Sequence, residues 1–207
     1  MRIERFCVGP VQTNCYFVIN EVTKEMFVLD PGDAAERLAE EIQTKEYQPT
    51  GILLTHGHFD HAGAAKELAE LLDVKIYAHE AEKATLEEPE YNRCGMIGKN
   101  ESYQADIYLR DKEEINLAGF TIEVLHTPGH TVGGCCYYIA EEAVVFSGDT
   151  LFCESVGRTD FPGGSMSRIV RSIKEKLLVM PEETKVYPGH MDATTIGAEK
   201  QWNPYLA

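Results

Sequence analysis

The sequence predicts a layered α/β fold in which β-sheets lie between outer helices. Short apolar segments bounded by Gly, Pro, Asn or Asp recur along the chain, which is typical of strands. Longer segments repeat apolar residues at the spacing of a helix. Two β-rich halves that both end in helices indicate packed sheets with helices outside. The 207 residues suit one domain, and we expect a single domain over residues 1–207.

The first half begins with two expected strands, 14–20 and 25–30, and the second strand is closed by Pro31 and Gly32. A helix follows, which we expect to begin with a capping box formed by Asp33 and Glu36. Its apolar face has helical spacing and consists of Ala35, Leu38, Ala39 and Ile42. Strands at 51–55 and 74–78 then enclose a second helix, whose apolar face consists of Ala65, Leu68, Ala69 and Leu72.

The second half begins after a segment without periodicity. Residues 82–106 contain Pro89, Gly95 and Gly98, so we expect a long irregular excursion that could serve as a lid or rim. A hairpin of strands at 114–117 and 120–125 follows, with its turn at Ala118 and Gly119. The remaining expected elements are strands at 135–139 and 143–147, a last helix at 167–178 and a final strand at 185–187.

Charge and composition exclude several kinds of partner. Lys and Arg total 19 against 34 Asp and Glu, and the resulting net charge of −15 repels nucleic acid. No segment is long and apolar enough to span a membrane. The N-terminal MRIERFCVGP has no apolar signal core, and the six cysteines include no Cys-x-x-Cys pair, so we expect a cytoplasmic protein. We expect the cysteines to be small buried residues, although Cys153 lies four residues after Asp149 and could matter.

The segment THGHFDHAG, residues 55–63, places three of the chain's seven histidines and an aspartate within six positions. Alternate side chains of an extended segment point the same way, so His56 and His58 can share one ion. Asp60 and His61 follow where the chain turns into a helix, and they can face a second point. Imidazoles coordinate metals in the neutral form, which explains how several can lie close together. One loop could thus serve two metal ions.

A metal site needs further ligands, and three turns supply candidates. Each is a polar residue in a Gly-containing turn after an apolar strand: His130 in HTPGH, Asp149 in SGD and His190 in PGH. Turns at the carboxyl ends of strands gather side chains into one cleft. We therefore expect these three residues to converge with the loop at 55–63.

The order THGHFDHAG, HTPGH, SGD and PGH resembles the metallo-β-lactamase superfamily over essentially the whole chain. The resemblance implies an αββα sandwich of two mixed β-sheets flanked by helices, with a binuclear metal centre in the cleft between its halves. It assigns His56, His58 and His130 to a first metal. Asp60, His61 and His190 are assigned to a second metal, and Asp149 bridges both. The resemblance thus implies two divalent ions. Imidazole and carboxylate ligands accept zinc, iron or manganese, and we expect zinc, with iron or manganese as alternatives.

Two such ions favour hydrolysis. They would lower the pKa of a bridging water from about 16 toward about 7 and polarise a substrate carbonyl, so a metal-bridging hydroxide could attack. Asp60 could orient this hydroxide and carry its proton, which makes it the candidate catalytic residue. Asp30 is a candidate partner for a ligand histidine. We expect a structural role for His126, which precedes a candidate ligand, and a surface or helix-start role for His79.

The stretch GRTDFPGGS at 157–165 resembles short, single-domain glyoxalase II-like hydrolases. That resemblance implies a small-molecule substrate, a thioester such as S-lactoylglutathione or a related hydroxyacyl thioester. The chain ends 17 residues after His190, so we expect it to lack the C-terminal helical domain that carries glutathione-binding residues in full-length glyoxalase II. The thiol could therefore differ from glutathione. Arg158 could hold a substrate carboxylate, or it could pair with Asp160 as structural support.

The main alternative is a mono-iron persulfide dioxygenase of the same superfamily, which the GRTDF stretch also resembles. Its single Fe(II) would depend on His56, His130 or a neighbour, and Asp149, and would leave the second set of ligands outside the coordination shell. A nuclease would bring an added domain and a basic surface, and a β-lactam hydrolase a secretion signal; the sequence shows none of these. A non-enzymatic metal-binding module is disfavoured because all seven ligands are present. The oligomeric state does not follow from the sequence.

Overall fold

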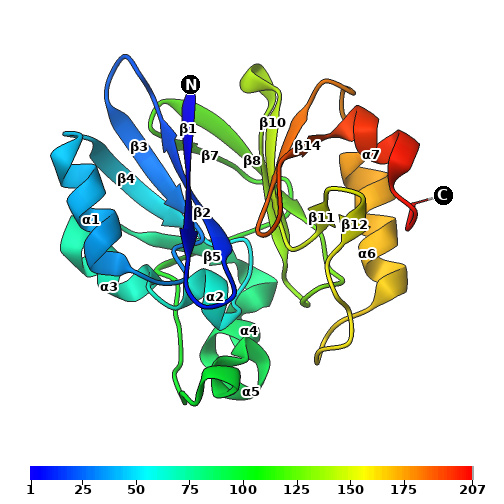
Figure 1. Cartoon of the computed structure of the whole chain (residues 1–207), viewed down its shortest axis with the longest axis horizontal. Coiled ribbons are helices and arrows are strands. Elements are labelled where there is room, and N and C mark those ends of the chain that lie inside the picture. The colour runs from blue at the N-terminus through cyan, green and yellow to red at the C-terminus, as the bar shows by residue number, and fades with distance from the viewer. Residues whose placement is uncertain (207) are drawn as a thin grey trace.

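The computed structural model describes residues 1–206, which form two six-stranded sheets packed together with helices on both outer faces (Figure 1). This arrangement confirms the predicted αββα sandwich. The first sheet consists, in spatial order, of β1 (Arg2–Val8), β2 (Thr13–Ile19), β3 (Glu25–Leu29), β4 (Gln48–Leu53), β5 (Ile76–His79) and β6 (Ile107–Leu109). The second consists of β14 (Thr194–Thr195), β13 (Lys185–Pro188), β10 (Val144–Gly148), β9 (Cys135–Ile139), β8 (Phe120–His126) and β7 (Glu114–Leu117).

Both sheets are mixed. In the first sheet β1, β2 and β3 are antiparallel, whereas β3, β4, β5 and β6 run parallel. Parallel strands need crossover connections, and helices make them: α1 (Ala35–Thr44), α2 (Phe59–Ala62), α3 (Ala65–Leu72), α4 (Lys83–Glu87) and α5 (Pro89–Asn92). The parallel strands therefore end at one edge of the sheet, where α2 lies.

The second sheet is antiparallel from β7 to β10, and β13 then pairs in parallel with β10. The crossover between them contains the small hairpin β11 (Leu151–Phe152) and β12 (Ser155–Val156) and the helix α6 (Met166–Ser172), which continues as a π-helical turn over Ile173–Leu177. The helix α7 (Ile196–Trp202) follows β14. The turns after β10 and β13 therefore lie side by side.

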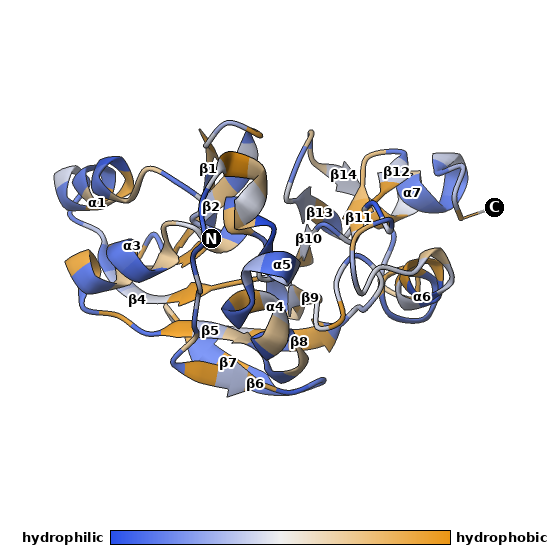
Figure 2. Cartoon of the chain, turned by 90° about the horizontal axis from the view of Figure 1, so that it is seen from below, coloured by the Kyte–Doolittle hydropathy of each residue, from blue (hydrophilic) through white to orange (hydrophobic). Residues whose placement is uncertain are grey.

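Three apolar layers hold these elements together. One cluster lies between the first sheet and its helices and includes Val28, Leu38 and Leu68. A second joins the two sheets through Phe27, Tyr137 and other buried strand residues. The third lies between the second sheet and the C-terminal helices. In Figure 2 the hydrophobic colour is strong on central strands such as β4, β5 and β8, whereas the helices mix hydrophilic and hydrophobic residues.

Most expected strands are confirmed within a few residues, but the structure corrects several other expectations. The predicted capping box is wrong, because Ala34 directly precedes α1 and adopts the left-handed conformation. The carboxylate of Asp33 accepts a hydrogen bond from the N–H of Ala34 (2.6 Å) and caps no helical residue. The excursion at 82–106 contains α4, α5 and a 3₁₀ turn, so it is not irregular throughout. The helix expected at 167–178 is not the last helix, because α7 follows it, and the strand expected at 185–187 is not the final strand, because β14 follows it. Strands β1 and β6 were not expected.

Within residues 1–206, none of the helices is both long and apolar enough to cross a lipid bilayer.

Candidate metal centre

The seven expected ligands lie on turns that follow four strands. One turn follows β4 of the first sheet, and the other three follow β8, β10 and β13 of the second sheet. The helix α2, which carries two of the ligands, lies below the sheets in Figure 1. The structure brings the side chains together in three overlapping groups, each with its ligand atoms within 4.8 Å of one another: His56, His58 and His130; His56, His61 and Asp149; and Asp60, His61 and His190.

The first group is a triangle of buried imidazoles. Nδ1 of His58 lies 3.0 Å from Nε2 of His56 and 2.9 Å from Nε2 of His130. The three rings stand nearly perpendicular to one another, with centroids 4.7 Å apart for each pair. Nitrogens that bind one tetrahedral ion at its usual bond length lie about 3.3 Å apart. The triangle therefore has the spacing of three ligands of a single ion.

Asp60, His61 and His190, called the second group from here on, combine a carboxylate with two imidazoles. Oδ2 of Asp60 lies 3.2 Å from Nε2 of His190 and 3.5 Å from Nε2 of His61. Asp60 also accepts a hydrogen bond from the hydroxyl of Thr13 at 2.9 Å, which fixes this oxygen relative to β2. The group thus has the mixed oxygen and nitrogen donors that zinc, iron and manganese accept.

Asp149 connects the two groups. Its Oδ1 lies 3.4 Å from Nε2 of His61, whereas its Oδ2 lies 3.5 Å from Nε2 of His130 and 3.7 Å from Nε2 of His190. One carboxylate oxygen therefore faces a ligand of the second group and the other faces ligands of both. This is the position that a bridging ligand requires.

Two buried polar atoms in the centre lack partners among the described residues: Nε2 of His61 and Oδ1 of Asp149. The other ring nitrogen of His61 lies 2.9 Å from Oδ2 of Asp30, to which it can donate its hydrogen. That tautomer leaves a lone pair on Nε2 directed toward Asp149. An unpaired buried atom is costly, and a divalent cation between these two atoms would satisfy both. The residues present therefore fit a metal pair.

Burial and neighbouring charges prepare the imidazoles of the first group to bind metal. Burial, together with the adjacent imidazoles, lowers the pKa of His56 well below its usual value. Burial and the proximity of His130 lower the pKa of His58 to about 3. Both rings are therefore neutral at physiological pH, which is the protonation state that coordinates a metal.

The carboxylates create the opposite potential nearby. Burial opposes a charge on His61, but Asp60, Asp30 and Asp149 outweigh it and raise the pKa of this imidazole. Burial also opposes ionisation of Asp149, yet its contact with His61 keeps the pKa of this carboxyl below its usual value. Positive charge is thus stabilised where the second group meets Asp149, which is the electrostatic condition for binding a cation.

Glycine allows two turns of the centre to approach each other. A Cβ atom at Gly189 would lie 2.4 Å from Oδ1 of Asp149 and 2.5 Å from Cε1 of His61. Gly148 has φ +48°, and a Cβ atom there would lie 2.3 Å from the hydroxyl of Thr55. The glycines of the SGD and PGH turns are therefore required by close packing around the candidate ligands.

The structure also places the residues that the sequence singled out beside the ligands. Asp30 contacts His61 as expected, and it accepts hydrogen bonds from the N–H (2.8 Å) and hydroxyl (2.7 Å) of Thr55. His79 starts a helical turn by accepting a hydrogen bond from the N–H of Ala81, as expected. His126 stacks on His79 and lies outside the three groups of ligands.

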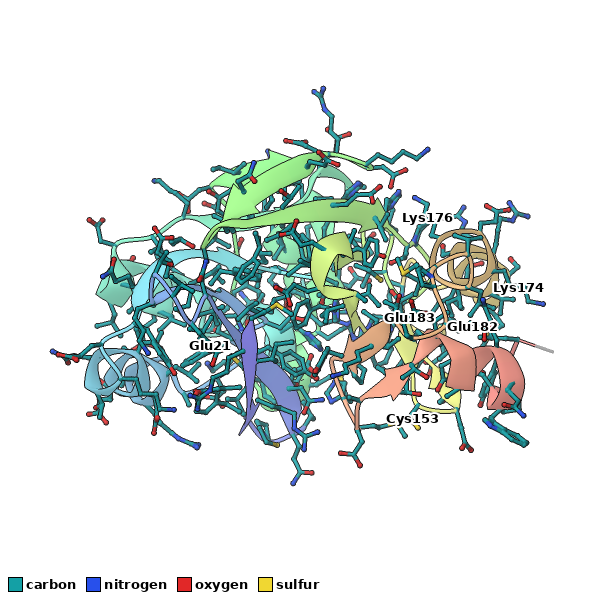
Figure 3. The ribbon with its side chains drawn as sticks, turned by 90° about the horizontal axis from the view of Figure 1, so that it is seen from above. Glu21, Cys153, Lys174, Lys176, Glu182 and Glu183 are labelled. Carbon is teal, nitrogen blue, oxygen red and sulfur yellow. The ribbon has the colours of Figure 1, made fainter. Side chains whose placement is uncertain are left out.

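Arg158 and Cys153 contribute less to the centre than their positions in the sequence suggest. The guanidinium of Arg158 donates two hydrogen bonds of 2.7 Å to Asp160, so its charge already has a carboxylate partner. Cys153 lies on the turn between β11 and β12 beside α7 (Figure 3) and is not among the residues that line the cleft. Burial and the nearby Glu199 raise the pKa of its thiol, which keeps it protonated.

Glu82 is a residue that the sequence analysis missed. It is completely buried, and its Oε1 accepts a hydrogen bond from the N–H of Gly57 at 3.0 Å. Its Oε2 accepts hydrogen bonds from the hydroxyl of Thr131 (3.0 Å) and the N–H of Gly133 (2.7 Å). Gly57 lies between two candidate ligands and Thr131 follows a third. Glu82 therefore joins the two loops that build the imidazole triangle.

A comparison with known proteins identifies the family. The family model of the metallo-beta-lactamase superfamily matches residues 8–190. The chain belongs to the metallo-beta-lactamase superfamily. It is accordingly a metal-dependent hydrolase in broad class, with a cluster of histidine and aspartate ligands.

Relatives of this superfamily member have similar length. It is 39% identical to "Probable metallo-hydrolase YqgX" of Bacillus subtilis, with alignment over 100% of the chain and 98% of the relative. It is 38% identical to "Hydroxyacylglutathione hydrolase GloC" of Haemophilus influenzae, with the same coverage of 100% and 98%. Both alignments extend over nearly the whole of both proteins.

Three solved structures resemble the chain. BLEG-1 B3 metallo-beta-lactamase is 40% identical with a TM-score of 0.94, covering 99% of both chains. TTHA1623 in a di-iron-bound form is 38% identical with a TM-score of 0.87, covering 98% of this chain and 100% of the other. ETHE1 from Myxococcus xanthus is 27% identical with a TM-score of 0.80, covering 99% and 84%.

Proposed function

We propose that the chain is a glyoxalase II-like thioesterase, which hydrolyses a hydroxyacyl thioester such as S-lactoylglutathione with the help of two divalent cations. The observation that carries the proposal is the pair of buried unpartnered atoms, Nε2 of His61 and Oδ1 of Asp149, 3.4 Å apart between two groups of ligands. A single ion in the imidazole triangle would leave both of them unsatisfied. The proposal treats residues 1–207 as one domain.

The proposed ligand set follows the geometry of the three groups. We assign the imidazole triangle to one ion, the group with Asp60 to the other and Asp149 to both: His56, His58, His130; Asp60, His61, His190; Asp149. Zinc is the favoured metal for these nitrogen and oxygen donors. Iron is supported by the di-iron form in which the relative TTHA1623 was solved.

A pair of cations, when bound, supplies a water of lowered pKa and polarises the carbonyl of the substrate. The protein's own contribution is to orient that water and to accept its proton. Asp60 lines the cleft and is 13% exposed, so a water in the cleft can donate a hydrogen bond to its carboxylate. Thr13 holds Oδ2 of this carboxylate from β2 at 2.9 Å. We therefore assign proton transfer to Asp60.

The cleft beside the candidate ligands suits a small thioester. It has a volume of about 390 Å³ and reaches three of the ligand histidines and both ligand aspartates. Its walls are largely apolar, with side chains from both halves of the sandwich: Val11, Phe59, Met96, Phe152, Val156, Phe161 and Met191. Apolar walls exclude bulk water from the reacting carbonyl. The name of the relative GloC, a hydroxyacylglutathione hydrolase, supports this substrate class.

β-Lactam hydrolysis is a second candidate, because BLEG-1 B3 metallo-beta-lactamase is 40% identical over 99% of the chain. The same metal pair would attack a strained amide in place of a thioester. Persulfide oxidation has weaker support, because that reaction would use a single iron. It would also leave the second group of ligands without a role.

A panel of three reactions tests the proposed function. The zinc-loaded and iron-loaded proteins would be assayed for release of thiol from S-lactoylglutathione, for opening of nitrocefin and for oxygen uptake with glutathione persulfide. We expect thiol release to exceed the other two by orders of magnitude in kcat/KM. Dominant nitrocefin opening, or rapid oxygen uptake with one iron per chain, would overturn the thioesterase assignment.

A further inference from the structure

Two guanidinium groups pack on a single aromatic ring at the wall of the cleft. Cζ of Arg158 lies 3.8 Å from the centroid of the Phe161 ring, and Cζ of Arg93 lies 4.5 Å from the same centroid. Phe161 in turn meets the imidazole of His58 edge to face, with 5.8 Å between centroids. All four residues line the cleft. Positive charge is therefore held one aromatic ring away from a candidate metal ligand.

The two arginines differ in their partners. The charge of Arg158 is neutralised by Asp160 through two hydrogen bonds of 2.7 Å. Nη1 of Arg93 donates only to the backbone carbonyl of Glu90 at 3.2 Å, and its Nε is buried without a partner. Among the described residues, no carboxylate lies within 4.0 Å of Arg93. Its positive charge thus lacks a counterion.

Among the described residues, Arg37, Arg168 and Arg171 also have no carboxylate partner, but all three are exposed to solvent. Arg93 is the partly buried arginine without a counterion. Acidic residues outnumber basic ones by 34 to 19, so carboxylates are abundant for pairing. Two guanidinium groups on one ring also repel each other, and Asp160 balances only one of them. An additional anion beside Arg93 would remove this imbalance.

The backbone holds Arg93 in place. Arg93 has φ +65° between α5 and the 3₁₀ turn Cys94–Ile97, a conformation that a non-glycine residue adopts at a cost. The preceding Asn92 is fully buried and anchors this turn by accepting a hydrogen bond from the N–H of Cys94. Its side-chain amide donates to the carbonyls of Leu86 (3.1 Å) and Glu101 (2.8 Å). The turn that carries Arg93 is therefore anchored by a buried side chain next to it.

We propose that Arg93 is the anion-binding residue of this cleft and that it takes a carboxylate carried by the substrate. The planar guanidinium, stacked on Phe161, would donate to the carboxylate oxygens while the acyl carbon lies over the candidate metal ligands. The inference rests on the proposed function, because it names the charge that the substrate of the same site carries. It assigns recognition to Arg93 and a supporting role to the Arg158 and Asp160 pair.

The test compares thioesters that share one acyl group and differ in charge. S-lactoylglutathione carries carboxylates, and the S-lactoyl thioester of N-acetylcysteamine carries none. In zinc-loaded Arg93→Gln we expect KM for the glutathione thioester to rise about tenfold or more, with kcat/KM for the uncharged thioester changed less than twofold. Arg93→Lys should recover part of the loss, since it keeps the charge. Lys99→Gln, which removes a charge from the same excursion, is the matched control and should affect neither KM.

A binding measurement separates this inference from the proposed function. S-hexylglutathione, a thioether that cannot be hydrolysed, would be titrated into the wild type and Arg93→Gln by calorimetry. Weaker binding to the variant by about tenfold supports the inference even if no thioester is hydrolysed. Equal binding to both proteins, or no binding to the wild type, would overturn the inference whether or not thioesters are hydrolysed. Where thioesters are hydrolysed, equal losses for the charged and uncharged substrates would also overturn it.

Discussion

Nε2 of His61 lies 3.4 Å from Oδ1 of Asp149, and both atoms are buried without a hydrogen-bond partner among the described residues. His61 lies in α2, which follows β4 of the first sheet, and Asp149 lies in the turn after β10 of the second sheet. Two unsatisfied buried atoms lower the stability of the fold at the point where the candidate ligands meet. A cation bound between the two atoms would satisfy both of them.

Removal of metal should lower the stability of the protein. A cation that binds only the folded state contributes about 2.7 kcal/mol when its free concentration is 100 times Kd. For a chain of this size, we expect the Tm to fall by about 5–10 °C after chelation, and to recover when zinc is returned. Differential scanning calorimetry of the metal-loaded and chelated proteins checks this. An unchanged Tm would mean that the ligands do not bind metal in the folded state.

Asp30→Asn should weaken metal binding without removing a ligand. Asp30 accepts a hydrogen bond from Nδ1 of His61 at 2.9 Å and so directs the lone pair of Nε2 into the centre. Loss of its charge should lower metal affinity about 10–100-fold, measured by competition with a chromophoric chelator. Asp33→Asn, at an exposed position three residues away, is the control. Equal affinity in Asp30→Asn and the wild type would show that the contact does not act on the metal.

Gly189→Ala should disrupt the shared ligand. The new Cβ would lie 2.4 Å from Oδ1 of Asp149 and 2.5 Å from Cε1 of His61, and backbone would have to move to relieve the contact. We expect the purified variant to retain at most one metal ion per chain and to lose most of its hydrolytic activity. Gly95→Ala is the control, because no atom lies within 4 Å of its added Cβ. Normal metal content in Gly189→Ala would contradict the packing described for this turn.

Glu82→Gln should destabilise the fold and loosen the imidazole triangle. The amide would direct an N–H toward Gly57, Thr131 or Gly133, which are all donors to the carboxylate. We expect a loss of about 1–3 kcal/mol in the free energy of unfolding of the metal-free protein, measured with urea, and weaker metal binding. Glu80→Gln, on an exposed glutamate two residues earlier, should change neither. A variant as stable as the wild type would assign no structural role to Glu82.

The convergence of the candidate ligands could be predicted from the sequence because each lies in a short local pattern. THGHFDHAG, HTPGH, SGD and PGH all follow apolar strands, and strands of a sheet place their ends together. The strands themselves were found through apolar runs bounded by turn residues. The contact between Asp30 and His61 was also within reach, because Asp30 ends a strand next to the one that leads to the histidines.

Contacts between distant segments could not be predicted in the same way. Glu82 and Gly57 are 25 residues apart, and no local pattern indicates that they meet. Arg93 lies in an excursion without periodicity, so its position beside Phe161 depends on the tertiary fold. Strand β1 was missed because three of its seven residues are charged and several are exposed at the sheet edge. The capping box failed because Ala34 adopts a left-handed conformation that no sequence pattern marked.

The number of metal ions bound per chain tests the central claim most directly. The metal-free protein would be saturated with zinc, freed of excess metal by gel filtration and measured by inductively coupled plasma mass spectrometry, with Asp149→Ala treated in the same way. The arrangement of the seven ligands predicts two ions per wild-type chain and at most one in the variant. One ion per wild-type chain at saturation would contradict the paired centre on which the proposed hydrolysis depends.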